Sequence, residues 1–408
     1  MGSSLKEKTI LLGVTGSISI YKSCELCSRL VQAGARVFVA MTTNAQKLIG
    51  PATFESISGN PVITGMFEPY TLGPLSHIKL SHEIDLFVVA PATANILAKT
   101  AHGIADDWVS TALLATTAPI LWAPAMNPQM FLNPATQSNI DILKKRGNVF
   151  IGPATGSTAC GETGPGRMEE PIYIFEEIDI ILGEPKDFAG KRILITSGPT
   201  QEPIDPVRYI SNRSSGKMGK ALAMEALRRG AEVTIISGPA SELPPKQANT
   251  IYVRTAQEMY EETIKRFPEY DIFIGSAAVA DYRVADPTDE KHKRNGKMHQ
   301  LELIPNPDIT KTVGGMKKPN QITVGFAAET HHLIEYAQEK LKKKNLDLII
   351  ANQVGGENCA FGSDYVYALM ITPQTIDEKP EYIPKNELTC RIFNRISEIM
   401  KTKQHPQI

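Results

Sequence analysis

The stretch ILITSGPTQEPIDPVRYISNRSSGKMG, Ile193 to Gly219, decides the fold. It begins with an apolar, β-rich run, Ile193–Ile195, which stops at a Ser-Gly-Pro turn and therefore predicts a buried strand. Towards its end apolar residues begin to recur at helical spacing, with Ser214 or Ser215 placed to cap a helix. The polar, proline-rich segment between predicts an irregular loop, which is long for a simple connection and therefore serves a ligand.

A strand, a long loop and a helix N-terminus together predict an anion site. The free N–H groups and the dipole of a helix start favour negative charge. Arg208, Asn212 and Arg213 in the loop can add hydrogen-bond donors. We therefore expect a phosphate or carboxylate group to bind beside this loop.

The same order of strand, turn, helix and strand occurs in both halves of the chain. In the first half the strand Thr9–Val14 precedes a helix to about Ala33 and a strand Val37–Met41. In the second half the helix runs to Arg229 and the next strand is 233–236. Three more apolar runs follow in each half: 85–90, 120–123 and 149–151, then 271–275, 322–325 and 346–351.

Strands that are apolar on both faces and alternate with helices predict parallel sheets covered on both sides. The expected fold class is α/β, with two Rossmann-like doubly wound domains, residues 1–188 and 189–408. In such sheets ligands bind beyond the carboxyl ends of the strands. Neither GxGxxG nor GxxxxGK[ST] is present, which disfavours a pyridine-nucleotide oxidoreductase and a P-loop enzyme.

Composition excludes several classes of partner. The net charge of −1 over 408 residues gives no reason to expect nucleic acid or an acidic membrane, and no apolar run is long enough to span a bilayer. The odd count of five cysteines indicates a reducing, cytoplasmic compartment. Cys24 and Cys27 form a lone CxxC inside the first predicted helix, where core packing is favoured over zinc.

Three segments of the first half carry candidate chemistry. PAMNPQM (124–130) presents Asn127 after a strand, either to grip a carboxylate or as an ordinary turn residue before proline. ACGETGPGRM (159–168) surrounds Cys160 with glycines, which predicts a flexible segment whose thiol can donate a proton, or an incidental loop cysteine. His77 is expected in a loop or at a strand start, where a lone histidine is more often structural than catalytic.

The second half adds a basic set that includes Lys291, Lys340 and Lys344. Such residues usually form a solvated face. Beside Asp281, at the end of a predicted strand, they can instead hold a triphosphate and its Mg²⁺. The segment Gly314–Lys318 predicts a surface hairpin.

The motifs together resemble one family along nearly the whole chain. They are GVTGSI-x-x-YK (13–22), SHI-x-L (76–80), PAMN-x-x-M, ACGE-x-G-x-GRM, SGPT-x-EPIDPVR-x-ISN-x-SSGKMG, AAVADYR (277–283), EK-x-K (290–293), NPDI (306–309), GFAAET (325–330) and LDLI-x-AN (346–352). The chain resembles the bacterial bifunctional enzymes of coenzyme A biosynthesis, a phosphopantothenoylcysteine decarboxylase fused to a phosphopantothenate–cysteine ligase.

The resemblance implies that the first half is an FMN-dependent decarboxylase. The expected FMN contacts are Gly16, Ser17, Ile18, Thr42, Thr93 and Ala94. FMN would oxidise the cysteine moiety of the substrate to a thioaldehyde, which makes loss of CO₂ easy. Cys160 would then donate a proton, His77 would act as an acid/base, and Asn127 would hold the departing carboxylate.

The resemblance implies that the second half is a CTP-dependent ligase working through an acyl cytidylate. Lys291 would stabilise the activation step, Asn212 would handle the acyl cytidylate, and Asp281 would bind Mg²⁺. The other expected substrate and nucleotide contacts are Arg208, Gly275, Ser276, Ala277, Asn306, Pro307, Asp308, Ile309, Phe326, Lys340 and Lys344. Asp281 belongs to that set as well.

The implied partners are phosphopantothenate, cysteine and CTP, without nucleic acid or membrane. A homo-oligomer is expected, with ligase dimers and decarboxylase trimers. The alternative is a non-catalytic FMN-binding regulatory module, which would be expected to lack His77 or Cys160.

Overall fold

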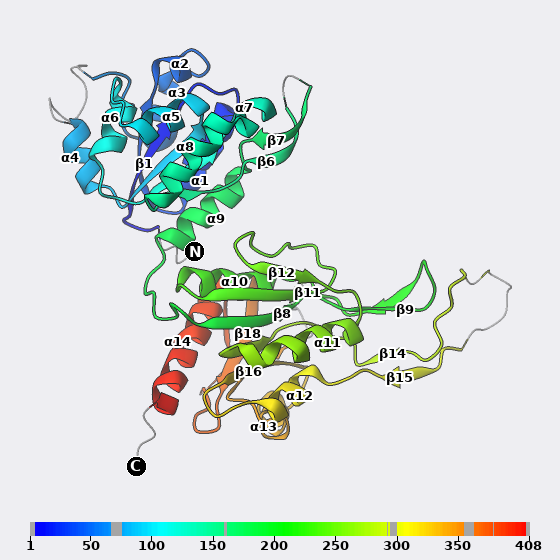
Figure 1. Ribbon diagram of the computed structural model, residues 1–408. Helices are drawn as coiled ribbons and strands as arrows, with labels where there is room; N and C mark the ends of the chain where they lie inside the picture. Colours follow the sequence, from blue (N-terminus) through cyan, green and yellow to red (C-terminus); the bar gives the residue numbers. More distant parts are fainter. Residues whose placement is uncertain are drawn as a thin grey trace. The chain divides into compact units, whose positions relative to one another are not determined.

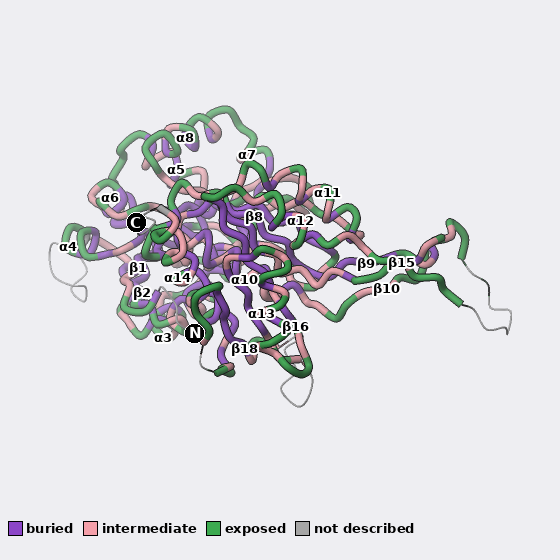
Figure 2. The backbone as a smooth tube through the Cα atoms, turned by 90° about the horizontal axis from the view of Figure 1, so that it is seen from below, coloured by how far each residue is buried: buried purple, intermediate pink, exposed green. Residues whose placement is uncertain are grey.

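The computed structural model describes residues 5–66, 76–158, 161–291, 293, 300–354, 363–377 and 379–404. The chain divides into two compact units, Gly2–Gly183 and Glu184–Ile408 (Figure 1). Each unit has a sheet with a parallel centre and helices on both faces, so the predicted α/β class is confirmed. Along the tube of Figure 2 the buried residues concentrate in the central strands, and the outer sides of the helices are exposed.

The first unit has a five-stranded parallel sheet in the order β2-β1-β3-β4-β5. Its strands are β1 (Thr9–Val14), β2 (Arg36–Met41), β3 (Leu86–Ala92), β4 (Ile120–Pro124) and β5 (Val149–Phe150). Ile10 and Leu12 pack into one core and Leu11 into the other, because successive side chains of a strand point to opposite faces. This is why the strand is apolar throughout.

Helices cover both faces of this sheet. One core contains residues of α1 (Ile20–Gln32), α3 (Pro51–Ser58) and α9 (Pro171–Ile181). The other contains residues of α4 (Ser76–Glu83), α5 (Ala94–His102), α6 (Trp108–Ala115) and α8 (Pro134–Lys145). Cys27 lies fully buried in the first core, as expected for a packing residue. The short α2 (Thr43–Gln46) and α7 (Pro128–Leu132) follow β2 and β4.

The second unit has eight strands in the order β12-β11-β8-β13-β16-β17-β18-β19. They are β8 (Arg192–Ser197), β11 (Glu232–Ser237), β12 (Asn249–Tyr252), β13 (Ile272–Gly275), β16 (Ile322–Glu329), β17 (Leu348–Gln353), β18 (Tyr365–Ile371) and β19 (Glu381–Pro384). The run β11-β8-β13-β16-β17 repeats the order of the first unit, so the predicted internal correspondence is confirmed. The antiparallel β18 and β19 extend the sheet and were not expected.

The helices of the second unit also lie on both faces of its sheet. α11 (Ala256–Arg266), α12 (Ile309–Met316) and α13 (Leu333–Lys343) pack on the face of Leu194 and Ile349. α10 (Lys217–Arg228) and α14 (Lys385–Gln404) contact each other and pack on the opposite face (Figure 1). The short 3-10 helix η1 (Phe267–Glu269) follows α11.

Three local predictions were wrong. The loop after β8 contains an antiparallel hairpin, β9 (Gln201–Pro203) and β10 (Tyr209–Ser211), because Glu202 is buried and accepts a hydrogen bond from the backbone N–H of Ala256 at 2.9 Å. The cap of α10 is Gly216 in a left-handed conformation, not a serine. The hairpin expected at Gly314–Lys318 is absent: α12 continues to Met316, and Gly314 is buried against the backbone of Lys344, which follows α13.

A second hairpin, β14 (Tyr282–Val284) and β15 (Leu303–Pro305), lies beside the first. Both hairpins project from the sheet of their unit (Figure 1). Among the described residues, no helix is long and apolar enough to cross a membrane.

Candidate active sites

The flavin residues expected in the first unit follow three neighbouring strands. Gly16, Ser17 and Ile18 follow β1, Thr42 follows β2, and Thr93 and Ala94 follow β3. In the order 2-1-3-4-5 the chain direction of the connections reverses between β1 and β3, which is where such sheets bind FMN. The structure therefore brings these six residues to one edge of the sheet.

The turn after β1 has a shape that only glycine allows. A Cβ at Gly16 would lie 2.7 Å from the Cβ of Asn44. Ile18 is 64% exposed, so this turn presents an apolar side chain at the edge of the site. These features fit a flat, partly apolar cofactor lying against the backbone.

Thr15 joins two of these turns and was not predicted. Its hydroxyl donates to the carbonyl oxygen of Pro91 at 2.7 Å and accepts from the backbone N–H of Thr93 at 3.2 Å. Thr93 in turn accepts from the N–H of Ile96 at the start of α5. The position of Thr15 within the GVTGSI motif was the available signal.

Asn127 caps α7 with its side-chain oxygen, which accepts from the N–H of Gln129 at 2.8 Å. Its Nδ2 donates to a carboxylate oxygen of Glu162 at 2.9 Å. Asn127 is thus a turn residue whose amide donates to a carboxylate of the protein itself, and its contact with a ligand carboxylate stays a prediction.

The strands β6 (Ala154–Ser157) and β7 (Thr163–Arg167), which flank the position of Cys160 in the sequence, pair as an antiparallel hairpin. Cys160 itself lies outside the described residues. In the described part of this segment, Gly166 lies in β7 and permits two backbone segments to approach closely. A Cβ at Gly166 would lie 2.3 Å from the carbonyl oxygen of Met126, and Met126 donates to the Gly166 carbonyl at 2.9 Å.

His77 lies in the first turn of α4, so the prediction of a loop or strand start is wrong. Its side chain lies outside the described part of the structure.

Lys22 is a buried cation that sequence reasoning missed. Its side chain is 6% exposed and its Nζ donates to the carbonyl oxygen of Met168 at 2.9 Å and to Glu170 at 2.8 Å. It therefore fastens α1 to the segment between β7 and α9. Its place in the motif GVTGSI-x-x-YK was the signal.

In the second unit one cavity of about 700 Å³ lies at the carboxyl ends of the central strands. Its lining includes Asn212 and every expected substrate or nucleotide residue except Arg208: Gly275, Ser276, Ala277, Asp281, Asn306, Pro307, Asp308, Ile309, Phe326, Lys340 and Lys344. These residues come from segments more than a hundred positions apart.

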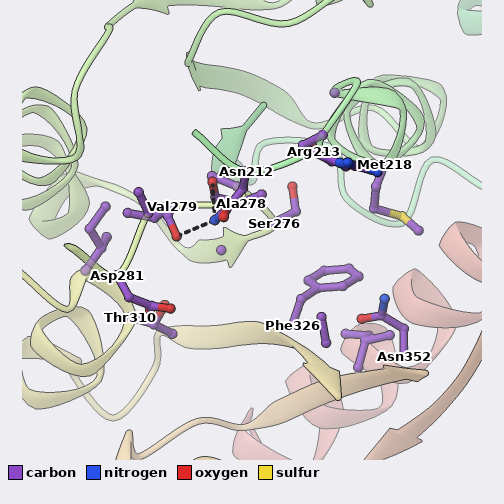
Figure 3. Close-up of a pocket in the computed structure, with 18 of the residues that line it drawn as sticks. Asn212, Arg213, Met218, Ser276, Ala278, Val279, Asp281, Thr310, Phe326 and Asn352 are labelled. Atoms are coloured by element: carbon purple, nitrogen blue, oxygen red, sulfur yellow. Dashed lines mark hydrogen bonds between the residues drawn. The ribbon is translucent and has the colours of Figure 1, made fainter. Parts of the chain in front are cut away.

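Asn212 connects the loop before α10 to the turn after β13. Its Nδ2 donates to the carbonyl oxygens of Val279 at 2.9 Å and Ala278 at 3.3 Å (Figure 3). The start of α10 comes close as well, because a Cβ at Gly219 would lie 2.0 Å from the Oγ of Ser197 at the end of β8. Only glycine permits this approach, which places the positive end of α10 at the cavity.

Hydrogen bonds and ion pairs hold other residues of the lining in place. Asn306 donates from Nδ2 to the carbonyl oxygen of Ala280 at 2.8 Å. Asp308 caps α12 and pairs with Lys344 at 3.0 Å. Lys340 pairs with Glu329 at the end of β16. The two lysines are thus held in place by carboxylates.

Two expected residues lie elsewhere. Arg208 pairs with the buried carboxylate of Asp205 through its guanidinium and does not line the cavity. Lys291 is exposed, in the segment between β14 and β15, and is also outside the lining.

Two further lysines, Lys217 and Lys385, line the cavity and were not predicted from the sequence. Lys217, in the first turn of α10, pairs with Asp364 at 2.7 Å, which raises the pKa of Lys217 and lowers that of Asp364. Lys385, at the start of α14, lines the same cavity and is 9% exposed. Burial, and then the charge of Lys217, lower the pKa of Lys385. Two cations with one carboxylate suit an anionic ligand.

No group of three or more His, Cys, Asp or Glu side chains could hold a metal ion within the described ranges. Mg²⁺ in nucleotide sites needs only one or two carboxylates together with phosphate oxygens. Asp281 and Asp308 in the cavity lining satisfy that requirement.

Two family models match the chain, one for each unit. The model "Flavoprotein" matches residues 2–183, and the model "DNA/pantothenate metabolism flavoprotein C-terminal domain" matches residues 188–400. The Coenzyme A biosynthesis bifunctional protein CoaBC of Vibrio vulnificus (strain YJ016) is 44% identical over 97% of this chain and 99% of its own. That of Bacillus subtilis (strain 168) is 46% identical over 97% and 98%.

Solved structures match each unit separately. A crystal structure of the C-terminal domain of a CoaBC protein is 37% identical, with a TM-score of 0.44, over 53% of this chain and 99% of its own. A crystal structure of the FMN-dependent cysteine decarboxylase SpaF is 31% identical, with a TM-score of 0.38, over 44% and 97%. The two family models agree with relatives that match almost the whole chain, and the chain therefore belongs to the family of the coenzyme A biosynthesis bifunctional proteins CoaBC.

Proposed function

We propose that residues 1–188 decarboxylate 4′-phospho-N-pantothenoylcysteine to 4′-phosphopantetheine with FMN, and that residues 189–408 join 4′-phosphopantothenate to cysteine with CTP. The observation that carries the proposal is the gathering of the expected ligase residues around one cavity of nucleotide size. Family membership supports the pathway, and the flavoprotein match supports the cofactor class.

In the decarboxylase, the turns after β1, β2 and β3 would hold FMN. When bound, FMN supplies the oxidation and the re-reduction that allow the carboxylate of the cysteine moiety to leave as CO₂. The amide of Asn127 holds that carboxylate, and the thiol of Cys160 gives a proton to the decarboxylated carbon. His77 acts as an acid/base. Absorbance of the purified protein between about 350 and 500 nm, where flavins absorb, tests flavin binding.

In the ligase, a carboxylate oxygen of phosphopantothenate attacks the α-phosphorus of CTP and pyrophosphate leaves. The amine of cysteine then attacks the acyl carbon and CMP leaves. Lys217, Lys385 and the start of α10 support a triphosphate at one end of the cavity. Asp281 would bind Mg²⁺ and Asn212 would orient the acyl cytidylate. Lys291 lies outside the cavity lining, and its match to the family motif EK-x-K assigns it to the activation step. Pyrophosphate release with CTP, compared with ATP, tests the nucleotide.

The enzyme works as a cytoplasmic homo-oligomer, with trimers of the decarboxylase and dimers of the ligase. The free thiols of Cys24, Cys27 and Cys390 suit a reducing compartment. Val207 and Tyr282 are exposed on the projecting hairpins, and such apolar side chains support pairing of ligase units. Light scattering on the full chain tests the assembly.

A further inference from the structure

The contact between Asn127 and Glu162 has a consequence for substrate binding. Asn127 Nδ2 donates to the Glu162 carboxylate at 2.9 Å. Asn127 is the residue assigned above to the carboxylate of the substrate. The protein therefore places its own carboxylate on the group that the substrate carboxylate needs.

Both partners are held in position from behind. The side-chain oxygen of Asn127 accepts from the N–H of Gln129, so its NH₂ group is the end that faces Glu162. The carbonyl oxygen of Glu162 accepts from the N–H of Thr158 at 2.8 Å and from the Thr158 hydroxyl at 2.9 Å. The Glu162 backbone is thus fixed by the β6–β7 hairpin, while its side chain is exposed and can turn away.

We propose that Glu162 is an internal competitor of the substrate carboxylate in the decarboxylase: its carboxylate accepts the hydrogen bond of the Asn127 amide in the empty site, and the substrate carboxylate must displace it. The inference rests on the proposed function of the first unit. A ligand without a carboxylate has nothing to offer Asn127 that Glu162 does not already supply.

The exchange separates substrate from product. Displacing Glu162 lowers the affinity for the substrate, whose carboxylate needs the Asn127 amide. Decarboxylation removes that carboxylate, and Glu162 then returns to the amide. The product, which lacks the carboxylate, is therefore bound with the Asn127–Glu162 contact in place.

The test compares wild type, Glu162→Ala and Glu162→Gln in the full-length, flavin-loaded protein. The rate of 4′-phosphopantetheine formation from phosphopantothenoylcysteine gives KM and kcat, and added 4′-phosphopantetheine gives the product inhibition constant. An exposed hydrogen bond is worth roughly a two- to tenfold change in affinity. We expect Glu162→Ala to lower KM for phosphopantothenoylcysteine by about that factor and to leave the inhibition constant of 4′-phosphopantetheine unchanged, and we expect KM of Glu162→Gln to lie between those of wild type and Glu162→Ala.

Glu25→Ala is the matched control, because Glu25 is an exposed carboxylate of the same unit that pairs with Arg29 on α1. It should change neither constant. If Glu162 merely supports Asn127, Glu162→Ala raises KM instead, and the inference is overturned. An unchanged KM, or an equal fall in the inhibition constant of the product, overturns it as well. An inactive wild type would refute the proposed function, and the inference would fall with it, whereas an active wild type confines any failure to Glu162. Flavin absorbance and Tm show whether Glu162→Ala is correctly folded. If it is not, the KM of Glu162→Gln decides whether the inference holds.

Discussion

Asn212 donates a hydrogen bond from its side-chain amide to the carbonyl oxygen of Val279 at 2.9 Å, and both residues line the ligase cavity. Asn212→Asp replaces this donor by a carboxylate that repels the carbonyl oxygens of Val279 and Ala278. We expect ligase kcat/KM, measured as CMP release, to fall about ten- to a hundredfold, since roughly 1–3 kcal/mol of interaction is lost. Asn249→Asp, on the edge strand β12, should retain wild-type rates, and equal losses in both variants would contradict the assignment.

Two adjacent glycines of α12 should respond in opposite ways to alanine. A Cβ at Gly314 would lie 1.8 Å from the backbone carbonyl oxygen of Lys344, whereas one at Gly315 meets nothing within 4 Å. We expect Gly314→Ala to lower the free energy of unfolding by about 1–3 kcal/mol or more. Gly315→Ala should raise it by about 0.5–1 kcal/mol, because alanine favours the helix. Urea unfolding measures both, and a neutral Gly314→Ala would refute this packing.

Lys344 should contribute to nucleotide binding, while its neighbour Lys343 should not. Lys344 lines the cavity and pairs with Asp308, and Lys343 is exposed on α13. Lys344→Met leaves the negative charge of Asp308 uncompensated in a cavity that binds an anionic nucleotide, so KM for CTP should rise roughly tenfold. Lys343→Met is the control and should leave KM for CTP unchanged. A similar KM in both variants would remove Lys344 from the site.

Binding of CTP should take up protons at alkaline pH. Burial and the charge of Lys217 lower the pKa of Lys385, so its neutral form grows as pH rises through that lowered value. An anion favours the charged form, and the affinity for CTP should therefore fall over this pH window. Calorimetric titration of the protein with CTP, in two buffers of different ionisation enthalpy, measures the number of protons taken up on binding. Lys385→Met should abolish this component, and an unchanged proton count would show that Lys385 does not face the nucleotide.

Cys27 should resist alkylation in the folded protein. It is fully buried, and burial raises the pKa of its thiol to about 12. At pH 8 its thiolate fraction is roughly a thousandfold below that of an ordinary cysteine. Iodoacetamide followed by peptide mass spectrometry should label the exposed Cys390 and leave Cys27 unmodified until urea is added. Rapid labelling of Cys27 in the native protein would contradict its burial.

The alternation of long apolar strands with amphipathic helices made the core of the fold predictable. Strands such as Thr9–Val14 need no partner information, because burial on both faces leaves a continuous apolar run. Strands three or four residues long, such as β9 and β19, carry no such pattern and depend on contacts between segments. The cap of α10 was missed for a similar reason, since Gly216 has a left-handed backbone and a Cβ there would lie 2.8 Å from the Cβ of Ala240, which is 24 positions away in the sequence.

The candidate sites divide in the same way. Asn212 and the NPDI segment stand out because motifs surround them, and the structure gathers them around one cavity. Lys385 stands alone at the start of α14, and only the folded sheet brings it beside Lys217. The pairing of Asn127 with Glu162 was equally hidden, because spacing along the chain says nothing about which side chain an amide will meet.

The most direct test of the central claim is mass spectrometry of one reaction. The purified chain is mixed with 4′-phosphopantothenate, cysteine, CTP and Mg²⁺. The account predicts that 4′-phosphopantetheine and CMP form together. Accumulation of phosphopantothenoylcysteine would mean an active ligase with a silent flavin half. If CTP is not consumed, the ligase assignment is wrong, and a non-catalytic flavin-binding module becomes the better description.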